Sequence, residues 1–379
     1  MYSPFRHISS VLWKHKPVHL TVFLTRRCNL RCSFCFYPVR KESSQVGRDK
    51  KHTEFSNGVN LSSDADKDMT ELNLDEIKKI SSSIGRLLWL AFSGGEIFLR
   101  KDLVEITRAF YEKNKPAIIL FPTNGILTEI IREKIEAILK YCEKSIIVVK
   151  LSLDGTEYVH NSIRGKGSFQ KTMQTYNALG GLLERYPNFE LGINTVFCSA
   201  NQDNMDSLIE FINKLDNIKT HTVSLIRGKV SDESLKNIDI NKYHRTLKKM
   251  ESNLRNRTSG IYRFKGARLK AAQDILQRRL IHETLIQKRQ LIPCYAGRLN
   301  LVLTESGDVY PCESFTMNIG NVKNYGYNLK SLLKTEQAEK IIHSIQNNKC
   351  YCTHECYFMT NILFNPRMYP LLLKEYMQV

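Results

Sequence analysis

Three closely spaced cysteines near the N-terminus constrain this chain more than any other feature of its sequence. Cys28, Cys32 and Cys35 have the spacing C-x3-C-x2-C and follow directly on residues 18–25, a β-branched and apolar run of strand length. Thiolates at this spacing can converge on one metal centre from a single tight loop. They leave one position of a four-iron cluster without a protein ligand, where a cofactor or substrate can bind. A structural zinc site with a fourth ligand such as His19 is the alternative.

Five further cysteines form a second group near the C-terminus. Cys294 and Cys312 are followed by Cys350, Cys352 and Cys356 in the spacing C-x-C-x3-C. The N-terminal residues lack the apolar core of a signal peptide and no apolar run is long enough to span a bilayer, so we expect a cytoplasmic protein. Disulfides are rare in that reducing compartment. Both groups therefore predict metal binding, with a zinc knuckle as the alternative for the second group.

Residues 72–226 alternate between apolar runs of strand length and stretches with helical periodicity. Strict alternation of strand and helix implies parallel strands joined by crossovers. Together with the strand at 18–25 there are six such units, so we predict an α/β fold, a partial (β/α)6 TIM-like barrel. In such folds the chemistry gathers at the C-terminal ends of the strands. The remaining strands are expected at 88–92, 117–121, 145–153, 191–197 and 221–226.

Composition divides the chain into three parts. We predict a barrel domain over residues 1–240, in which the polar stretch 40–70 is a mobile insertion. Residues 241–290 are typical of a basic helical linker. Residues 291–379 are expected to form a small C-terminal α+β domain, which contains a hairpin at 299–310 and holds the second cysteine group.

The first cysteine group and the end of the predicted second strand resemble the radical S-adenosylmethionine (SAM) superfamily. The cysteine triplet is followed directly by the aromatic Phe36, as in the superfamily's cluster motif, and Gly94-Gly95-Glu96 is similar to its GGE motif. The resemblance implies that this second motif holds the methionine amino group of SAM. Glycine lets the backbone approach a ligand closely, and Glu96 can accept hydrogen bonds from an ammonium.

Further matches extend the resemblance over most of residues 18–230. Asn124 ends the predicted third strand, Ser152 ends the fourth, and Arg164 follows in Ile-Arg-Gly-Lys-Gly. By resemblance, Ser152 and Arg164 contact the ribose and carboxylate of SAM; a turn residue and a solvated arginine are the alternatives. The resemblance implies a [4Fe–4S] cluster that binds SAM through its unligated iron. An external flavodoxin- or ferredoxin-like donor reduces it, SAM cleavage yields a 5′-deoxyadenosyl radical, and this radical takes hydrogen from the substrate.

The second cysteine group resembles the SPASM and twitch extensions of radical SAM enzymes. Cys294 and Cys312, with a glycine between them, have the spacing C-x12-G-x4-C of the hairpin that carries the first ligands of an auxiliary [4Fe–4S] cluster. A full SPASM tail has seven cysteines and two clusters, whereas this chain has five, so one cluster of the twitch type fits better. The resemblance implies the ligands Cys294, Cys312, Cys352 and Cys356, with Cys350 as a rival to Cys352.

The net charge of +18 is compatible with an anionic substrate, a nucleic acid or a membrane surface. We predict a radical SAM oxidoreductase that abstracts hydrogen from an anionic small molecule or a peptide, assisted by the auxiliary cluster; no catalytic side chain is assigned. A weak contact with a membrane surface or polyanion is a further expectation, because residues 245–289 are strongly basic and the tail 362–376 is apolar. The alternative is a non-enzymatic iron–sulfur or zinc protein that binds RNA through residues 245–289.

Overall fold

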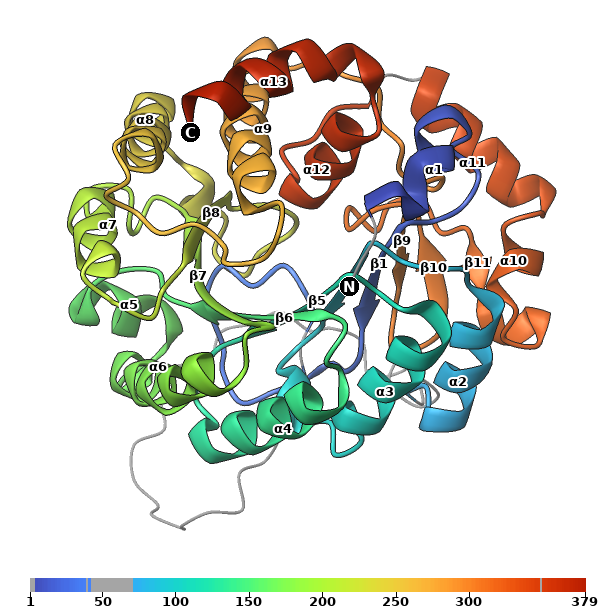
Figure 1. Ribbon diagram of the computed structural model, residues 1–379, viewed down its shortest axis with the longest axis horizontal. Helices are drawn as coiled ribbons and strands as arrows, with labels where there is room; N and C mark the ends of the chain where they lie inside the picture. The colour runs from blue at the N-terminus through green and yellow to red at the C-terminus, as the bar shows by residue number, and fades with distance from the viewer. Residues whose placement is uncertain (1–3, 39, 42–70, 348–349) are drawn as a thin grey trace.

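In the residues that the structure describes, a nine-stranded sheet organises the protein. The computed structural model describes residues 4–38, 40–41, 71–347 and 350–379, so the predicted insertion at 40–70 lies outside the described residues from position 42 on. The strand order is β11-β10-β9-β1-β4-β5-β6-β7-β8. From β1 to β8 the strands run parallel and in chain order, which confirms the predicted partial barrel (Figure 1). These strands are β1 (His19–Phe23), β4 (Trp89–Ser93), β5 (Ile118–Thr123), β6 (Ile146–Ser152), β7 (Phe189–Phe197) and β8 (Thr220–Leu225).

Amphipathic helices cover the outer face of the parallel strands (Figure 1). Every residue of β1 is buried, because a strand covered on both faces meets little water. The first of these helices starts with a capping box, in which Asn73 and Glu76 each bind the other's backbone N–H. The covering helices are α2 (Leu74–Ser83), α3 (Leu103–Asn114), α4 (Thr128–Tyr141), α5 (Glu157–Arg164), α6 (Ser168–Arg185) and α7 (Met205–Asn213).

The C-terminal segment extends the barrel sheet on the side of β1. β9 (Asn300–Leu303) runs parallel to β1, and β10 (Asp308–Tyr310) returns antiparallel to β9, which confirms the predicted hairpin. β11 (Gly320–Asn321) follows β10 at the edge of the sheet. The division into domains at 240 and 290 stays a prediction. The other elements are η1 (Pro4–His7), α1 (Ile8–Leu12), β2 (Arg27–Cys28), β3 (Arg40–Lys41), η2 (Ile97–Leu99), η3 (Glu233–Lys236), η4 (Val322–Tyr325), α10 (Leu329–Leu332), α11 (Glu336–Asn347) and η5 (Pro366–Met368).

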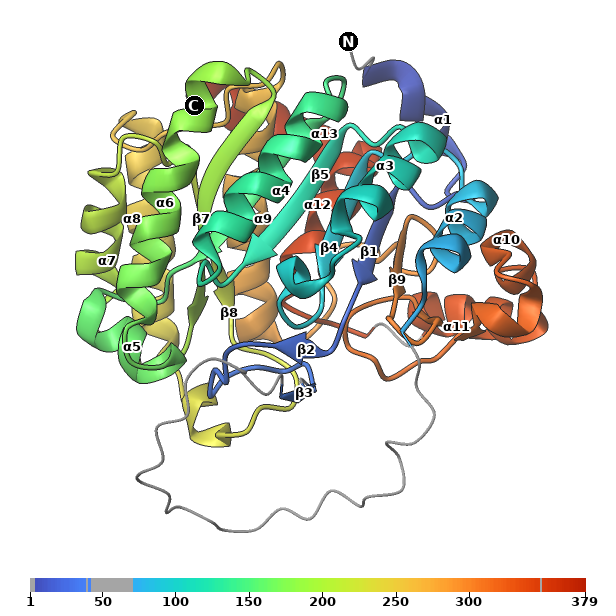
Figure 2. The same ribbon diagram turned by 90° about the horizontal axis from the view of Figure 1, so that it is seen from below.

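Helices from the C-terminal third of the chain close the open side of the barrel. α9 (Ala267–Gln287) packs against α12 (Glu355–Leu363), and α13 (Tyr369–Gln378) packs on α9. Figures 1 and 2 show these three helices between β8 and the β1 side of the sheet. The segment 241–290, predicted as a basic linker, therefore consists largely of α8 (Ile240–Arg255) and α9, and α9 forms part of the barrel wall.

Several basic side chains of this segment form ion pairs within the molecule. Arg255 and Arg279 both pair with Glu251 and Glu375, which joins α8, α9 and α13. The tail that was considered for a membrane contact thus packs on α9. Among the described residues, no helix is long and apolar enough to cross a bilayer.

Candidate functional site

A cavity of about 350 Å³ lies among the C-terminal ends of the parallel strands, where barrel enzymes carry their active sites. Its wall contains Cys28, Cys32 and Cys35 and extends to Cys356 of α12. The cavity therefore joins the first cysteine group to the C-terminal segment. The predicted cofactor-binding residues that line it are Phe36, Gly94, Gly95, Glu96, Asn124, Ser152 and Arg164.

The first cysteine group lies on a tight loop that follows β1. The N–H of Cys35 donates to the carbonyl of Cys32 (3.0 Å), and all three residues are partly buried. Burial raises the pKa of each thiol, to about 11 for Cys28, where the neighbouring Cys32 and Cys35 raise it further. Such thiols become thiolates when a metal centre supplies positive charge. The donor set fits a cluster held by three thiolates with one open position.

The side chains of the described residues do not form a site for a single metal ion. In the part of the chain that the structure describes, no three His, Cys, Asp or Glu side chains form a site for one metal ion. The thiols of an iron–sulfur cluster bind different iron atoms, so a cluster spreads its ligands over a larger space than a single ion does.

The two glycines of the GGE motif are required by the cysteine loop itself. The N–H of Gly95 donates to the carbonyl of Thr25 (2.7 Å), and the next N–H donates to the carbonyl of Arg27 (2.9 Å). A Cβ at Gly95 would lie 2.7 Å from the carbonyl carbon of Arg27 and 3.1 Å from the Cβ of Cys28. The glycines were expected to admit a ligand, whereas here they admit the backbone that carries the thiols.

Glu96 is a buried carboxylate that faces the cavity. It is 2% exposed and accepts hydrogen bonds from the N–H of Phe98 (3.2 Å), the hydroxyl of Thr123 (3.0 Å) and the N–H of Asn124 (2.9 Å). Burial raises its pKa to about 7, although these donors act in the opposite direction. An approaching ammonium would stabilise the charged form, so the residue suits the role that the resemblance implies. The side chain of Asn124 donates to Asn29 (2.7 Å) and thereby ties the motif to the cysteine loop.

Arg164 is held against the cysteine loop by Asp154, for which the sequence suggested no role. Its guanidinium is paired with the Asp154 carboxylate, and Nη1 lies 3.5 Å from the sulfur of Cys32. Asp154 is fully buried and also accepts from the N–H of Val196 (2.8 Å). Its position two residues beyond Ser152, at the C-terminal end of β6, is the signal that could have identified it. The predicted contacts of Ser152 and Arg164 with SAM stay predictions.

Four thiols of the second cysteine group lie near one another and the fifth, Cys356, lines the cavity; the predicted ligand set Cys294, Cys312, Cys352 and Cys356 stays a prediction. The pKa of Cys352, raised to about 12 mainly by burial, is raised further by its neighbours Cys294, Cys312 and Cys350, so these four thiols lie near one another. Beyond burial, the pKa of Cys356 responds most to Glu313, Arg227 and Glu355. The physical reason is that α12 begins at Glu355, and its first turn directs Cys356 into the barrel cavity.

An ion-pair cluster joins the barrel to the C-terminal segment. Arg227, just after β8, donates from Nη2 to Glu313 and from Nη1 to Glu355, both at 3.1 Å. His354 lies 3.7 Å from the Glu313 carboxylate. Burial raises the pKa of both glutamates, whereas Arg227 lowers it. Arg227 also lies 5.2 Å from the ring centre of Phe36, beside the first cysteine group. The sequence analysis assigned no role to either glutamate, although each adjoins a cysteine in the chain.

The partial barrel carries three thiols, a glycine pair and a buried carboxylate at its C-terminal mouth. This arrangement fits the class of iron–sulfur, SAM-binding enzymes that the sequence motifs resemble. The model of the radical SAM superfamily matches residues 22–212, and the chain belongs to this superfamily. The model of the SPASM iron–sulfur cluster-binding domain matches residues 294–357. The enzyme therefore uses a [4Fe–4S] cluster and SAM, and its C-terminal segment is of a type that binds auxiliary iron–sulfur clusters.

Several characterised proteins are similar to this chain. The subtilosin biosynthesis protein AlbA of Bacillus subtilis is 24% identical over 360 residues, which cover 90% of this chain and 66% of AlbA. A cysteine-type anaerobic sulfatase-maturating enzyme of Clostridium perfringens is 24% identical over 341 residues, or 84% of this chain and 80% of that enzyme. A solved structure of anSMEcpe with bound AdoMet and the Kp18Cys peptide has a TM-score of 0.58 at 17% identity, covering 96% of this chain and all of the other. The structural similarity shows a shared fold.

Proposed function

We propose that this enzyme modifies a peptide or protein side chain by radical hydrogen abstraction. When bound, the cluster and SAM supply a hydrogen-abstracting radical. The residues of the chain bind these groups, exclude water and hold the substrate in reach. The observation that carries the proposal is the continuous cavity from Cys28, Cys32 and Cys35 to Cys356, which gives a substrate access to both metal-binding segments.

We assign the SAM-binding roles as follows. Cys28, Cys32 and Cys35 hold the cluster, and Glu96 accepts hydrogen bonds from the amino group of SAM. Arg164 places its positive charge beside Cys32, where it stabilises the thiolate form. The remaining predicted contacts line the same cavity and complete the SAM site; they are Phe36, Gly94, Gly95, Asn124 and Ser152.

We assign the auxiliary cluster to Cys294, Cys312, Cys350 and Cys352. Support comes from the pKa values of Cys294, Cys350 and Cys352: each is raised mainly by burial and further by the nearby Cys312. Four thiolates complete the ligand set of a [4Fe–4S] cluster. In this assignment Cys356 is the fifth thiol, and it faces the substrate instead of the cluster.

The charges of the cavity favour a peptide over a small anionic metabolite. Arg164 is neutralised by Asp154, and Lys270 by Asp274. Arg227 meets two carboxylates at once. Three of the four Lys and Arg side chains that line the cavity are therefore paired with carboxylates, and among the described residues Lys150 alone is not, which weakens the case for a highly charged anionic metabolite. The similar proteins AlbA, in subtilosin biosynthesis, and the sulfatase-maturating enzymes point in the same direction.

The test uses anaerobically reconstituted enzyme with dithionite and SAM. We expect release of 5′-deoxyadenosine from the wild type and none from Cys32→Ala, while Cys142→Ala, a buried cysteine outside both groups, keeps the activity. Loaded enzyme that releases none would overturn the radical assignment.

The substrate class is tested with two deuterated pools from the same cells, one of peptides and one of small metabolites. Deuterium in 5′-deoxyadenosine should come from the peptide pool. Transfer from the metabolite pool alone would refute the peptide assignment and leave the radical chemistry intact.

A further inference from the structure

A buried lysine lies on β6, and the residues in register with it on the next two strands leave room for its side chain. Lys150 of β6 is in register with Gly192 of β7, which in turn is in register with Thr220 of β8. A Cβ at Gly192 would lie 2.6 Å from Nζ of Lys150 and 2.5 Å from the hydroxyl of Thr220. The missing side chain at Gly192 thus lets the lysine reach across β7 to Thr220.

The ammonium of Lys150 meets neutral partners in this position. Nζ donates to the hydroxyl and to the carbonyl (3.3 Å) of Thr220, and it lies 5.6 Å from the ring centre of Tyr262. Lys150 is 5% exposed, and no carboxylate oxygen of the described residues lies within 4 Å of it. The adjacent Lys270 is paired with Asp274. Among the described residues, Lys150 is therefore a buried cation of the cavity wall that forms no ion pair with a carboxylate.

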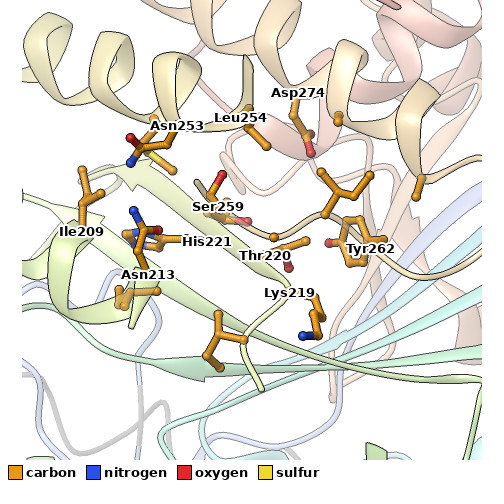
Figure 3. Close-up of a pocket in the computed structure, with 18 of the residues that line it drawn as sticks. Ile209, Asn213, Lys219, Thr220, His221, Asn253, Leu254, Ser259, Tyr262 and Asp274 are labelled. Carbon is orange, nitrogen blue, oxygen red and sulfur yellow. The ribbon is translucent and has the colours of Figure 1, made fainter. Parts of the chain in front are cut away.

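Lys150 lines the same cavity as the first cysteine group and Glu96. It precedes Ser152 by two residues on β6, so its Cα lies roughly 6.6 Å below the predicted SAM layer. Thr220, Tyr262 and Asp274 line a second, smaller cavity of about 60 Å³, shown in Figure 3. That volume suits a few water molecules. Lys150 lines the cavity of the cysteines and does not line this small one, so a substrate group in the larger cavity can reach it.

We propose that the part of the cavity around Lys150 is a carboxylate subsite, in which this lysine binds a carboxylate of the substrate. This inference rests on the proposed peptide substrate and specifies one of its groups. Two peptide groups have this chemistry, the C-terminal α-carboxylate and the side chain of an acidic residue. A charged ligand of this kind neutralises the buried ammonium and uses its third N–H donor.

The electrostatics around Lys150 make binding observable as proton uptake. Burial lowers the pKa of Lys150 to about 7; Asp274 raises it, Lys270 and Arg278 of the same helix lower it, and Glu190 of β7 raises it. The nearby His221 stays neutral, because its own pKa is about 3. A bound carboxylate favours the charged lysine, so binding near pH 7 should take up about half a proton, and more at higher pH.

The experiment is anaerobic calorimetry of the loaded enzyme in two buffers of different ionisation enthalpy. The probes are N-acetylglycine, which carries an α-carboxylate, and N-acetylaspartate N-methylamide, which carries a side-chain carboxylate. We expect one of them to bind with proton uptake, and the tighter one identifies the substrate group. Lys150→Met should weaken binding roughly tenfold or more, whereas Lys150→Arg should bind without proton uptake. Lys140→Met, on the outer face of α4, is the control and should match the wild type.

Binding of neither probe, or equal binding to the wild type and Lys150→Met, would overturn the subsite. Should a variant fail to load iron, the absence of proton uptake by the wild type across the neutral range still refutes the role of Lys150. Because the assay needs no SAM cleavage, its failure is distinct from a failure of the proposed radical chemistry.

Discussion

Replacement of Gly95 by alanine tests whether the GGE motif shapes the cysteine loop. The added Cβ would lie 2.7 Å from the carbonyl carbon of Arg27, where carbon atoms normally stay about 3.5 Å apart or more. The loop backbone must then retreat by roughly 0.8 Å. Two hydrogen bonds anchor the loop there, from the N–H groups of Gly95 and Glu96 to the carbonyls of Thr25 and Arg27.

The loss of folding stability caused by Gly95→Ala can be estimated from these contacts. Each lost hydrogen bond costs about 0.5–1.5 kcal/mol, and overpacking of a tight contact adds about 1–3 kcal/mol. The total of about 2–6 kcal/mol is below or near the stability of a typical domain, so we expect a folded barrel with a displaced cysteine loop. Anaerobic reconstitution should then yield about four irons instead of about eight, because the auxiliary cluster remains.

Gly181→Ala is the matched control. Gly181 lies within α6, and a Cβ there meets nothing within 4 Å. Alanine at an open helical position stabilises by about 0.5–1 kcal/mol, so the iron content should stay at the wild-type level. Iron counting and circular dichroism on the same samples separate loss of the cluster from loss of the fold. A Gly95→Ala enzyme with full iron content would refute the packing argument.

Three further predictions concern charge and ligands. SAM affinity should fall about tenfold per unit below pH 7, where Glu96 is protonated, and Glu96→Gln should remove this slope in binding titrations. Iron counts should stay near eight in Cys356→Ser and fall to about four in Cys350→Ser; equal loss would make Cys356 a ligand. Arg227→Met should lower the free energy of unfolding, measured by chemical denaturation, by about 3–5 kcal/mol, because it leaves two buried carboxylates without their arginine partner. Arg185→Met, an exposed pair, should cost less than about 1 kcal/mol.

The barrel and the residues at its C-terminal end could be predicted from the sequence for a physical reason. Strands covered on both faces read as apolar runs, and β6, Ile146–Ser152, is an example. The C-terminal ends of parallel strands meet at one edge, so motifs that follow different strands converge there. The first cysteine group, Glu96 and Arg164 were therefore expected at one end of the barrel, and in the structure they line one cavity.

The remaining site residues depend on contacts that sequence periodicity does not encode. Glu313 and Glu355 meet Arg227 from 86 and 128 residues away. The direction of Cys356 follows from the residue at which α12 begins, and helix ends are poorly defined by local propensity. In the sequence, Lys150 is only a polar residue within an apolar strand. Its possible role depends on the strand register, which aligns it with Gly192 and Thr220.

The pairing of β9 with β1 fixes the position of the C-terminal cysteine segment relative to the first cysteine loop. Glu305, just after β9, binds the hydroxyl of Tyr37 and pairs with Arg26, which flank the first cysteine loop. Phe315, just after Cys312, packs against Phe23 at 5.2 Å between ring centres. Buried ion pairs and aromatic contacts of this kind resist relative motion, because each part would lose its partners. The separation between the two cysteine groups is therefore set by one sheet.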